Sequence, residues 1–433
     1  MSSIKVLVVD DSLTFRAILL SVLEKFKVIE QTRQAKDGIE ALNILETYEP
    51  DLVLLDIEMP RLSGLPTLRI AKRRYPHIEF LIVSGATRGA AELTVQAIDA
   101  GAIDFIVKPK ATVQSSGAET MERRLSPFIR YIAARPPSLL KLKKKKALNW
   151  SDSLVETTPG ISSSSIKDIL KKSKTIKDPE KIVDPDLNID SRASHRAETT
   201  RYNGFFTANE EQDSGLKGSH YQKLVNTYTK HSDKFRLKLV VIGASTGSPG
   251  VLTSIISNMP PHFPAPIVVI VHLPDTFAIS FARHLAAKSK ISVSLASDNQ
   301  VMLPGTVYVA RADKHLTVAF DPNIALGHIP YKFVYDDSPP VNGIRPSIDK
   351  MFFSLAHSGV TGCLGIIMTG MGKDGTAGIS ELSQLPGNYF IAQSPDTCVV
   401  SSMPQSLINS NLANEIVDLD DLSSAIISKG QNL

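Results

Sequence analysis

Residue types that mark particular protein classes are scarce in this chain. Cysteine occurs only as Cys363 and Cys398, both among apolar neighbours and at no spacing that would bind a metal ion. This usage fits a reducing compartment better than a secreted, disulfide-stabilised protein. We therefore expect both thiols to lie in a hydrophobic core and the chain to be cytoplasmic.

Long apolar segments are also lacking. No uninterrupted run approaches the ~20 residues that a membrane-spanning helix needs. The chain enters a strand-like stretch, IKVLVV, soon after Met1, without a signal-peptide pattern. Its length of 433 residues exceeds what one ordinary core organises. We expect two domains, neither of them inserted in a membrane.

The chain lacks a general excess of basic charge, because its net positive charge is confined to one segment. Residues 136–235 hold 18 of the 48 Lys and Arg and 13 of the 44 Asp and Glu, so the rest of the chain is almost neutral. The run KLKKKK at 141–146 is typical of a solvated connector, although a polyanion-binding patch is the alternative. Because no helix-turn-helix pattern occurs, we expect no nucleic-acid partner.

Two parts of the chain alternate apolar, strand-like runs with amphipathic helical runs. The first extends to about residue 134 and includes IKVLVV, DLVLLDI, EFLIVSG and DFIVK. The second starts at Leu237 and includes LKLVVIGA, APIVVIVHL, CLGIIMTG and NYFIAQ. Such alternation predicts βαβ units with parallel sheets. Within the second part, TVYVARADKHLTVAF (306–320) predicts a hairpin.

These patterns predict an α/β protein with two doubly wound, parallel-sheet domains. The first, at 1–135, is expected to be flavodoxin-like, and the second, at 236–433, Rossmann-like. Residues 136–235 contain SSSS, scattered lysines and Asp-Pro pairs with little periodicity. This composition is typical of a long flexible linker.

Charged side chains follow three strands of the predicted first sheet. Asp10 and Asp11 follow the first strand, Asp56 ends the third, and Lys108 ends the fifth. Carboxyl ends of parallel strands meet at one edge, where three carboxylates would repel each other without a cation. We expect Mg²⁺ and Lys108 to neutralise phosphoryl oxygens while one carboxylate attacks phosphorus. Ser84, which ends the fourth strand, can donate a hydrogen bond to that group.

The motifs VVDDS, LLDIEMP, VSG and DFIVKP occur in this order within about 110 residues, and the set resembles the response-regulator receiver family. The resemblance implies a phospho-acceptor aspartate, a magnesium site, two switch residues and a phosphate-sensing lysine. The phospho-acceptor is Asp56, and Asp10, Asp11 and Asp56 hold the magnesium ion together with the backbone carbonyl of Glu58. The switch residues are Ser84 and Phe105, and the phosphate-sensing lysine is Lys108. Isolated aspartates more often only cap helices.

A second group of polar residues follows strands of the second domain. Ser245 lies in a G-x-S-x-G turn at 243–247, His272 ends the next strand, and Asp374 lies in TGMGKDG. A serine on a sharp strand-to-helix turn, a histidine and an orienting carboxylate at one sheet edge form a nucleophile-base-acid set. Backbone N–H groups of the glycine-rich turn at 369–375 can stabilise an oxyanion.

Other interpretations of this second site are weaker. GASTG alone is as often a phosphate or dinucleotide loop, but a dinucleotide site would have an acidic residue at the end of the second strand, where His272 lies. His272 alone would more often be structural, and Asp374 could cap a helix. An α/β-hydrolase has its acid before its histidine, which is the reverse of the order here.

The motifs IGASTG, VHLP, LPGTVYVA, PPVNGIRPSIDKMF, TGMGKDG and CVVSSMP are together similar to the catalytic domain of chemotaxis protein-glutamate methylesterases. This resemblance implies Ser245 as nucleophile, His272 as general base and Asp374 as its orienting partner. It also implies that Thr246 and the backbone amide of Met371 stabilise the oxyanion. Ser248 replaces a usual glycine, and Val271 a common glutamine.

The resemblance further implies hydrolysis of glutamate γ-methyl esters on chemoreceptors, with methanol release, in chemotaxis adaptation; many members of the family also deamidate receptor glutamines. The partners would be methylated receptor cytoplasmic domains and a histidine kinase as phosphodonor. The esterase chemistry would need no cofactor. We expect phosphorylation of Asp56 to move the first domain away from Ser245. The alternative is a non-catalytic adaptor whose second domain only binds partners.

Overall fold

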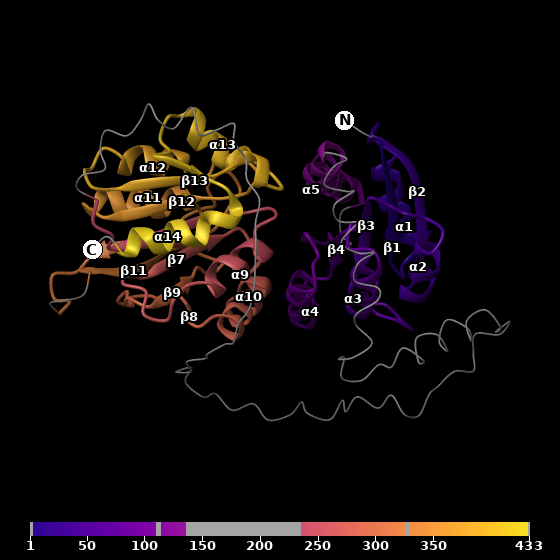
Figure 1. Cartoon of the computed structure of the whole chain (residues 1–433), viewed down its shortest axis with the longest axis horizontal. Helices are drawn as coiled ribbons and strands as arrows, with labels where there is room; N and C mark the ends of the chain where they lie inside the picture. Colours follow the sequence, from indigo (N-terminus) through magenta and orange to yellow (C-terminus); the bar gives the residue numbers. More distant parts are fainter. Residues whose placement is uncertain (1–2, 110–113, 136–234, 326–328, 432–433) are drawn as a thin grey trace, which may run out of the picture.

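The computed structural model describes residues 3–109, 114–135, 235–325 and 329–431. The predicted linker therefore lies outside the described residues, apart from Phe235. Figure 1 shows two separate α/β units, one from the N-terminal part of the chain and one from the C-terminal part. No helix in the described ranges has the length and apolar character to cross a membrane.

The first unit is a five-stranded parallel sheet in the order β2-β1-β3-β4-β5. Its elements are β1 (Ile4–Val9), α1 (Leu13–Leu23), β2 (Ile29–Ala35), α2 (Gly38–Leu45), β3 (Leu52–Asp56), α3 (Gly64–Arg74), β4 (Glu79–Ser84), α4 (Arg88–Asp99), β5 (Asp104–Val107) and α5 (Gln114–Ala134). The central strands β3 and β4 are buried along their whole length because helices cover both faces, whereas the edge strand β2 is largely polar and exposed. The flavodoxin-like prediction is confirmed.

The second unit is a seven-stranded parallel sheet in the order β14-β13-β12-β6-β7-β9-β8. Its strands are β6 (Leu239–Ala244), β7 (Ile267–Val271), β8 (Ser292–Leu295), β9 (Thr306–Val309), β12 (Cys363–Ile367), β13 (Tyr389–Gln393) and β14 (Glu415–Val417). The α-helices are α9 (Pro249–Ser257), α10 (Asp275–Lys288), α11 (Ile348–His357), α12 (Thr376–Leu382), α13 (Ser402–Asn409) and α14 (Leu422–Gln431). The chain builds the sheet outward from β6 in both directions, so a topological switch point lies beside β6.

The hairpin prediction for 306–320 is wrong in its pairing. Its first half is β9, which pairs in parallel with β7 and β8. Its second half is β10 (His315–Phe320), which pairs antiparallel with β11 (Tyr331–Asp336) in a separate two-stranded sheet. TVYV is apolar enough to be buried on both faces of the main sheet, whereas HLTVAF alternates and covers one face only.

The two units pack against each other through α4 and α10, which face one another in Figure 1. Ala91 and Val95 of α4 belong to the same buried apolar cluster as Phe281 of α10. At the rim, Lys288 forms an ion pair with Asp99 over 2.9 Å. The first unit therefore supplies part of the hydrophobic core of the second.

Candidate active site

The predicted nucleophile, Ser245, lies in the turn just after β6. Two glycines close to it, one in this turn and one after β12, leave no room for a side chain. The Ser245 N–H donates to the carbonyl of Thr369 over 2.9 Å, which ties the turn to the end of β12. Gly247 has a φ of +81°, and a Cβ there would lie 2.5 Å from Val399. A Cβ on Gly370 would lie 2.8 Å from the Ser245 Cβ. These glycines let the backbones of β6 and β12 converge beside the serine.

The predicted base, His272, and its predicted partner, Asp374, are in contact. The His272 Nε2 lies 2.9 Å from the Asp374 Oδ2. Because Nε2 is engaged there, Nδ1 is the ring nitrogen left to accept the proton of Ser245. Across the described residues, the Ser245 hydroxyl has no hydrogen-bond partner, so the link between serine and histidine is not formed in this arrangement. The adjoining strand ends are held by the His272 N–H donating to the Ala244 carbonyl over 3.3 Å.

Asp374 is buried and accepts four hydrogen bonds. Besides His272, the donors are the Ser347 hydroxyl (2.9 Å) and the backbone N–H groups of Ile348 (2.8 Å) and Asp349 (2.9 Å). Burial opposes ionisation, but the hydrogen bond and charge of His272 and the two N–H groups hold the pKa of Asp374 below its usual value. Asp374 is therefore a carboxylate at the N-terminus of α11, fixed in orientation toward His272.

Two backbone amides near Ser245 are available to bind an anion. Within the described ranges, the N–H groups of Thr246 and Met371 donate no hydrogen bond. The loop that carries Met371 is fixed by Ser402, whose hydroxyl accepts from the Gly372 N–H (3.1 Å) and donates to the Gly370 carbonyl (3.0 Å). Met371 is 48% exposed. This geometry suits the predicted oxyanion-binding role.

Residues around Asp374 were missed as site residues by sequence reasoning. Ser347, Ile348 and Asp349 lie in the motif PPVNGIRPSIDKMF. Nothing in the pattern of this motif shows that the first residues of α11 contact Asp374, which lies in a different loop. His315 is fully buried and its Nδ1 accepts from the Ser347 N–H over 3.0 Å. No signal in the sequence identifies His315, because its partner is a backbone group.

The predicted acidic cluster of the first unit is assembled at the carboxyl edge of its sheet. Candidate ligand atoms of Asp10, Asp11 and Asp56 lie within 4.8 Å of one another. The Lys108 Nζ lies 2.7 Å from carboxylate oxygens of both Asp10 and Asp56. Burial, partly offset by Lys108, raises the pKa of Asp56 to about 6, and the nearby Asp10 adds to the rise. Three hard oxygen donors around one point are a donor set that fits Mg²⁺.

The other predicted residues of this unit, Glu58, Ser84 and Phe105, have different surroundings. Glu58 is exposed, and its N–H is 3.5 Å from the Asp56 Oδ1. The buried Ser84 hydroxyl interacts with Thr94 (2.8 Å) and the Gly85 carbonyl (3.3 Å), not with Asp56. Phe105 is turned toward the second unit and stacks on Phe277, with ring centroids 4.3 Å apart.

The first unit also contacts the nucleophile turn directly. The Gly247 N–H donates to the Asp104 Oδ2 over 2.6 Å. Asp104 is buried, and its other oxygen accepts from the Phe105 N–H over 2.8 Å. Burial raises the pKa of Asp104 to about 7, against the effect of the two N–H groups. A carboxyl group of the first unit thus caps the turn two residues beyond Ser245.

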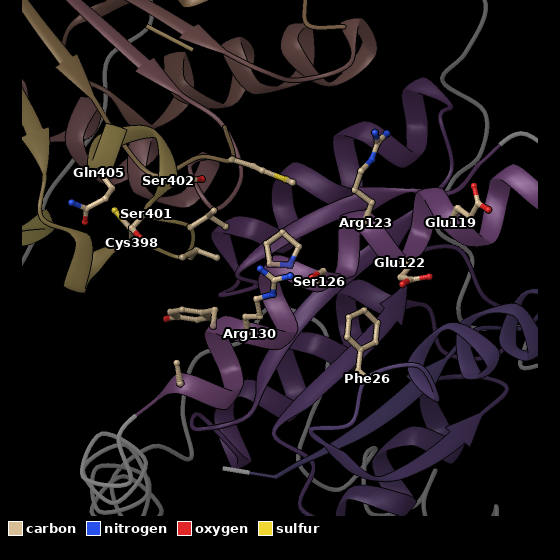
Figure 2. Close-up of a pocket in the computed structure, with 16 residues that line it drawn as sticks. Phe26, Glu119, Glu122, Arg123, Ser126, Arg130, Cys398, Ser401, Ser402 and Gln405 are labelled. Atoms are coloured by element: carbon tan, nitrogen blue, oxygen red, sulfur yellow. The ribbon is translucent and has the colours of Figure 1, made fainter. Parts of the chain in front are cut away.

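A cavity of about 1010 Å³ separates α5 from the loop that carries Met371. Figure 2 shows Arg123, Arg130 and Glu122 on one side of it and Ser401 and Ser402 on the other. The first unit therefore faces the Met371 loop across an open space.

Comparisons with known proteins show the family to which the chain belongs. Residues 6–115 match the response regulator receiver domain, and residues 240–426 match the CheB methylesterase. The protein-glutamate methylesterase/protein-glutamine glutaminase of Treponema pallidum is 30% identical over 99% of this chain and 98% of its own. That of Symbiobacterium thermophilum is 31% identical over 98% of this chain and 96% of its own. The crystal structure of the Thermotoga maritima CheB methylesterase catalytic domain is 37% identical, covers 44% of this chain and 98% of that chain, and has a TM-score of 0.41. The chain belongs to the CheB methylesterase family and carries a receiver domain ahead of its methylesterase domain.

Proposed function

We propose that this chain is a protein-glutamate methylesterase whose activity is controlled by phosphorylation of its receiver domain. The observation that carries the proposal is the contact between His272 and Asp374 at the sheet edge where Ser245 leaves β6. Its substrates are methylated chemoreceptor cytoplasmic domains, and we extend the proposal to deamidation of receptor glutamines. Both activities appear in the names of its relatives.

The proposed reaction is an acyl transfer in two steps. The Ser245 hydroxyl attacks the ester carbonyl while the His272 Nδ1 takes its proton, and Asp374 stabilises the imidazolium. The N–H groups of Thr246 and Met371 stabilise the tetrahedral oxyanion. His272 then returns the proton to the departing methanol, and water hydrolyses the acyl-enzyme to a free glutamate. An amide follows the same course and releases ammonia. This chemistry draws on no cofactor.

The receiver domain would supply the control signal. We assign Asp56 as the phospho-acceptor and a histidine kinase as its phosphodonor. Asp10, Asp11, Asp56 and the Glu58 carbonyl would hold Mg²⁺, which when bound offsets the negative charge of phosphoryl oxygens. Lys108 already contacts two of these carboxylates, so it is placed to pair with a phosphoryl group on Asp56.

Strand β5 offers the route from that signal to the esterase. Lys108 follows the carboxyl end of β5, while Asp104 and Phe105 at its start contact Gly247 and Phe277 of the second unit. When Lys108 shifts to a phosphoryl group, the strand carries the change to both contacts. Ser84 would turn to the phosphoryl group, and Phe105 would leave Phe277. We propose that the receiver then undocks and a protein substrate can approach the triad.

The proposed organisation keeps the predicted boundaries. We assign residues 1–135 to the receiver domain, 136–235 to a linker and 236–433 to the esterase domain. The family matches at 6–115 and 240–426 fall within the two domains. The cytoplasm is the proposed location, because both the kinase and the receptor segment would be met there.

Methanol release from methylated chemoreceptor membranes tests the function. We expect release by the wild-type chain, an increase on adding an acyl-phosphate donor, and none by Ser245→Ala. Ser257→Ala, at the end of α9, is the control and should act as wild type. Release that persists in Ser245→Ala contradicts the assigned nucleophile. A wild-type chain that binds receptors but releases no methanol would instead be the adaptor.

A further inference from the structure

A second carboxyl group, that of Asp349, lies beside Asp374. Both side chains are buried, each 9% exposed. The Asp349 N–H donates to the Asp374 Oδ1, while the Asp349 Oδ1 accepts from the N–H groups of Gly375 (2.9 Å) and Gly378 (2.8 Å). Each aspartate therefore caps the segment that carries the other: Asp374 caps the first turn of α11, and Asp349 caps the start of α12.

The fit between these two segments leaves little room for rearrangement. A Cβ on Gly378 would lie 2.6 Å from the Asp349 carbonyl oxygen, and Gly375 has a φ of +98°. Over the described part of the chain, Asp349 forms no ion pair with a lysine or arginine. The backbone N–H groups that bond its carboxyl group belong to the segment directly after Asp374, so removing this group frees the loop that carries Asp374.

The two carboxyl groups also compete for protons. Burial and the neighbouring Asp374 raise the pKa of Asp349, whereas the pKa of Asp374 is lowered. A buried pair of acids titrates as a unit, and the first proton goes to the member with the higher pKa. That member is Asp349, so Asp374 keeps the negative charge that faces His272. Other titratable groups packed here are His315, through Ser347, and the Lys350–Asp336 ion pair beside α11.

We propose that Asp349 is a positioning residue for the esterase: its carboxyl group fixes the backbone that carries Asp374. The inference rests on the proposed hydrolase function, and it adds a fourth side chain to the triad. Asp349 acts through Asp374 and does not touch the substrate.

Two variants test this role. Both glycine N–H groups bond the same oxygen of Asp349, so Asp349→Asn can keep both bonds while remaining neutral at every pH. Asp349→Ala keeps neither. We expect the kcat of Asp349→Ala to fall about 10- to 100-fold with KM little changed, since misplacing a catalytic group has effects of this size. Asp349→Asn should retain most of the wild-type kcat.

A resonance of His272 distinguishes positioning from a purely structural role. The proton on the His272 Nε2 that bonds Asp374 gives an NMR resonance that reports the placement of Asp374 and needs no substrate. This resonance should move in Asp349→Ala, where the Asp374 loop is freed, and stay at its wild-type position in Asp349→Asn. Together with kcat it gives two readouts. Asp321→Ala, in the β10–β11 turn, removes a turn-capping carboxylate elsewhere and should leave both readouts at wild-type values.

The outcomes separate this inference from the proposed function. A wild-type chain without esterase activity overturns the proposed function, while the His272 resonance still tests Asp349. An active wild type, together with a folded Asp349→Ala of unchanged kcat, overturns the positioning role. If Asp349→Ala does not fold, Asp349→Glu decides, because it displaces the carboxyl group by one methylene: a wild-type kcat with an unmoved His272 resonance overturns the positioning role.

Discussion

The buried carboxyl group of Asp104 makes the resting state of the proposed enzyme sensitive to pH. In the docked arrangement its pKa is about 7, compared with 3.8 for an ordinary aspartate. The docked form therefore binds the proton more tightly than the undocked form. Docking is favoured below the ordinary pKa and weakens as the pH rises toward 7, because the ionised carboxylate is then buried with two N–H groups and no cation.

The size of the effect follows from the difference in pKa. If docking caused the whole shift, the penalty would be about 4 kcal/mol at 1.36 kcal/mol per unit. We expect docking to account for about 1–2 kcal/mol of this, a factor of roughly 5–30 in the docked population. The unphosphorylated chain should thus gain activity as the pH rises from about 5 to 7, relative to the phosphorylated chain, whose triad has the same intrinsic pH dependence.

One other titratable group at this interface acts in the opposite direction. His284 of α10 lies 3.7 Å from Asp99 of α4, and burial lowers its pKa. Acidification therefore disfavours docking through His284. The Lys288–Asp99 and Arg283–Glu92 ion pairs also join α10 to α4. We would therefore measure the Asp104 effect in a His284→Gln background.

The assay is the ratio of methanol release without and with an acyl-phosphate donor, followed from pH 5 to 8. In the His284→Gln chain this ratio should rise with pH. Adding Asp104→Asn removes the ionisable group, so the ratio should become flat. If the two profiles run parallel, the pH response does not come from Asp104 and the reasoning is wrong.

Three further predictions concern other contacts. Gly370→Ala should lower kcat at least about 10-fold and lower Tm, because its Cβ would clash with both Ser245 and the Met403 sulfur. Single-turnover kinetics measure the first effect and thermal unfolding the second. Phe105→Ala loses its stacking on Phe277, worth about 0.5–1.5 kcal/mol beyond burial, and should raise unphosphorylated activity at least several-fold; unchanged basal methanol release would contradict the docking contact. Chelation with EDTA should abolish stimulation by the acyl-phosphate donor while leaving basal hydrolysis intact, and restored stimulation on adding Mg²⁺ is the control.

The parts of the fold that were predictable are those whose residues carry a local signal. LVLLD in β3 and VVDD at the end of β1 are apolar runs that end in acids, so period and position together indicate a central parallel strand and a ligand at its carboxyl end. Strands β2 and β14 carry little such signal, because they are edge strands, and IEQTRQA and EIV are partly polar or short. The pairing of β10 with β11 depends on tertiary contacts that TVYVARADKHLTVAF does not encode locally.

The predicted site residues were likewise limited to groups on the motifs themselves. Strand ends predicted that Ser245, His272 and Asp374 lie at one sheet edge, but not which imidazole nitrogen faces the acid. That choice depends on where α11 starts, since its N–H groups orient the Asp374 carboxylate. Asp104 escaped notice because its partner is a backbone amide of the other unit, more than 140 positions away.

The shared apolar cluster of Ala91 and Val95 with α10 has a consequence for the timing of the signal. The proposed undocking would expose this apolar surface to water, which costs free energy, so the docked arrangement is the more stable one. The receiver domain should therefore dock again without any further signal. We expect the duration of each response to be set by the lifetime of the acyl phosphate, with reclosure following promptly.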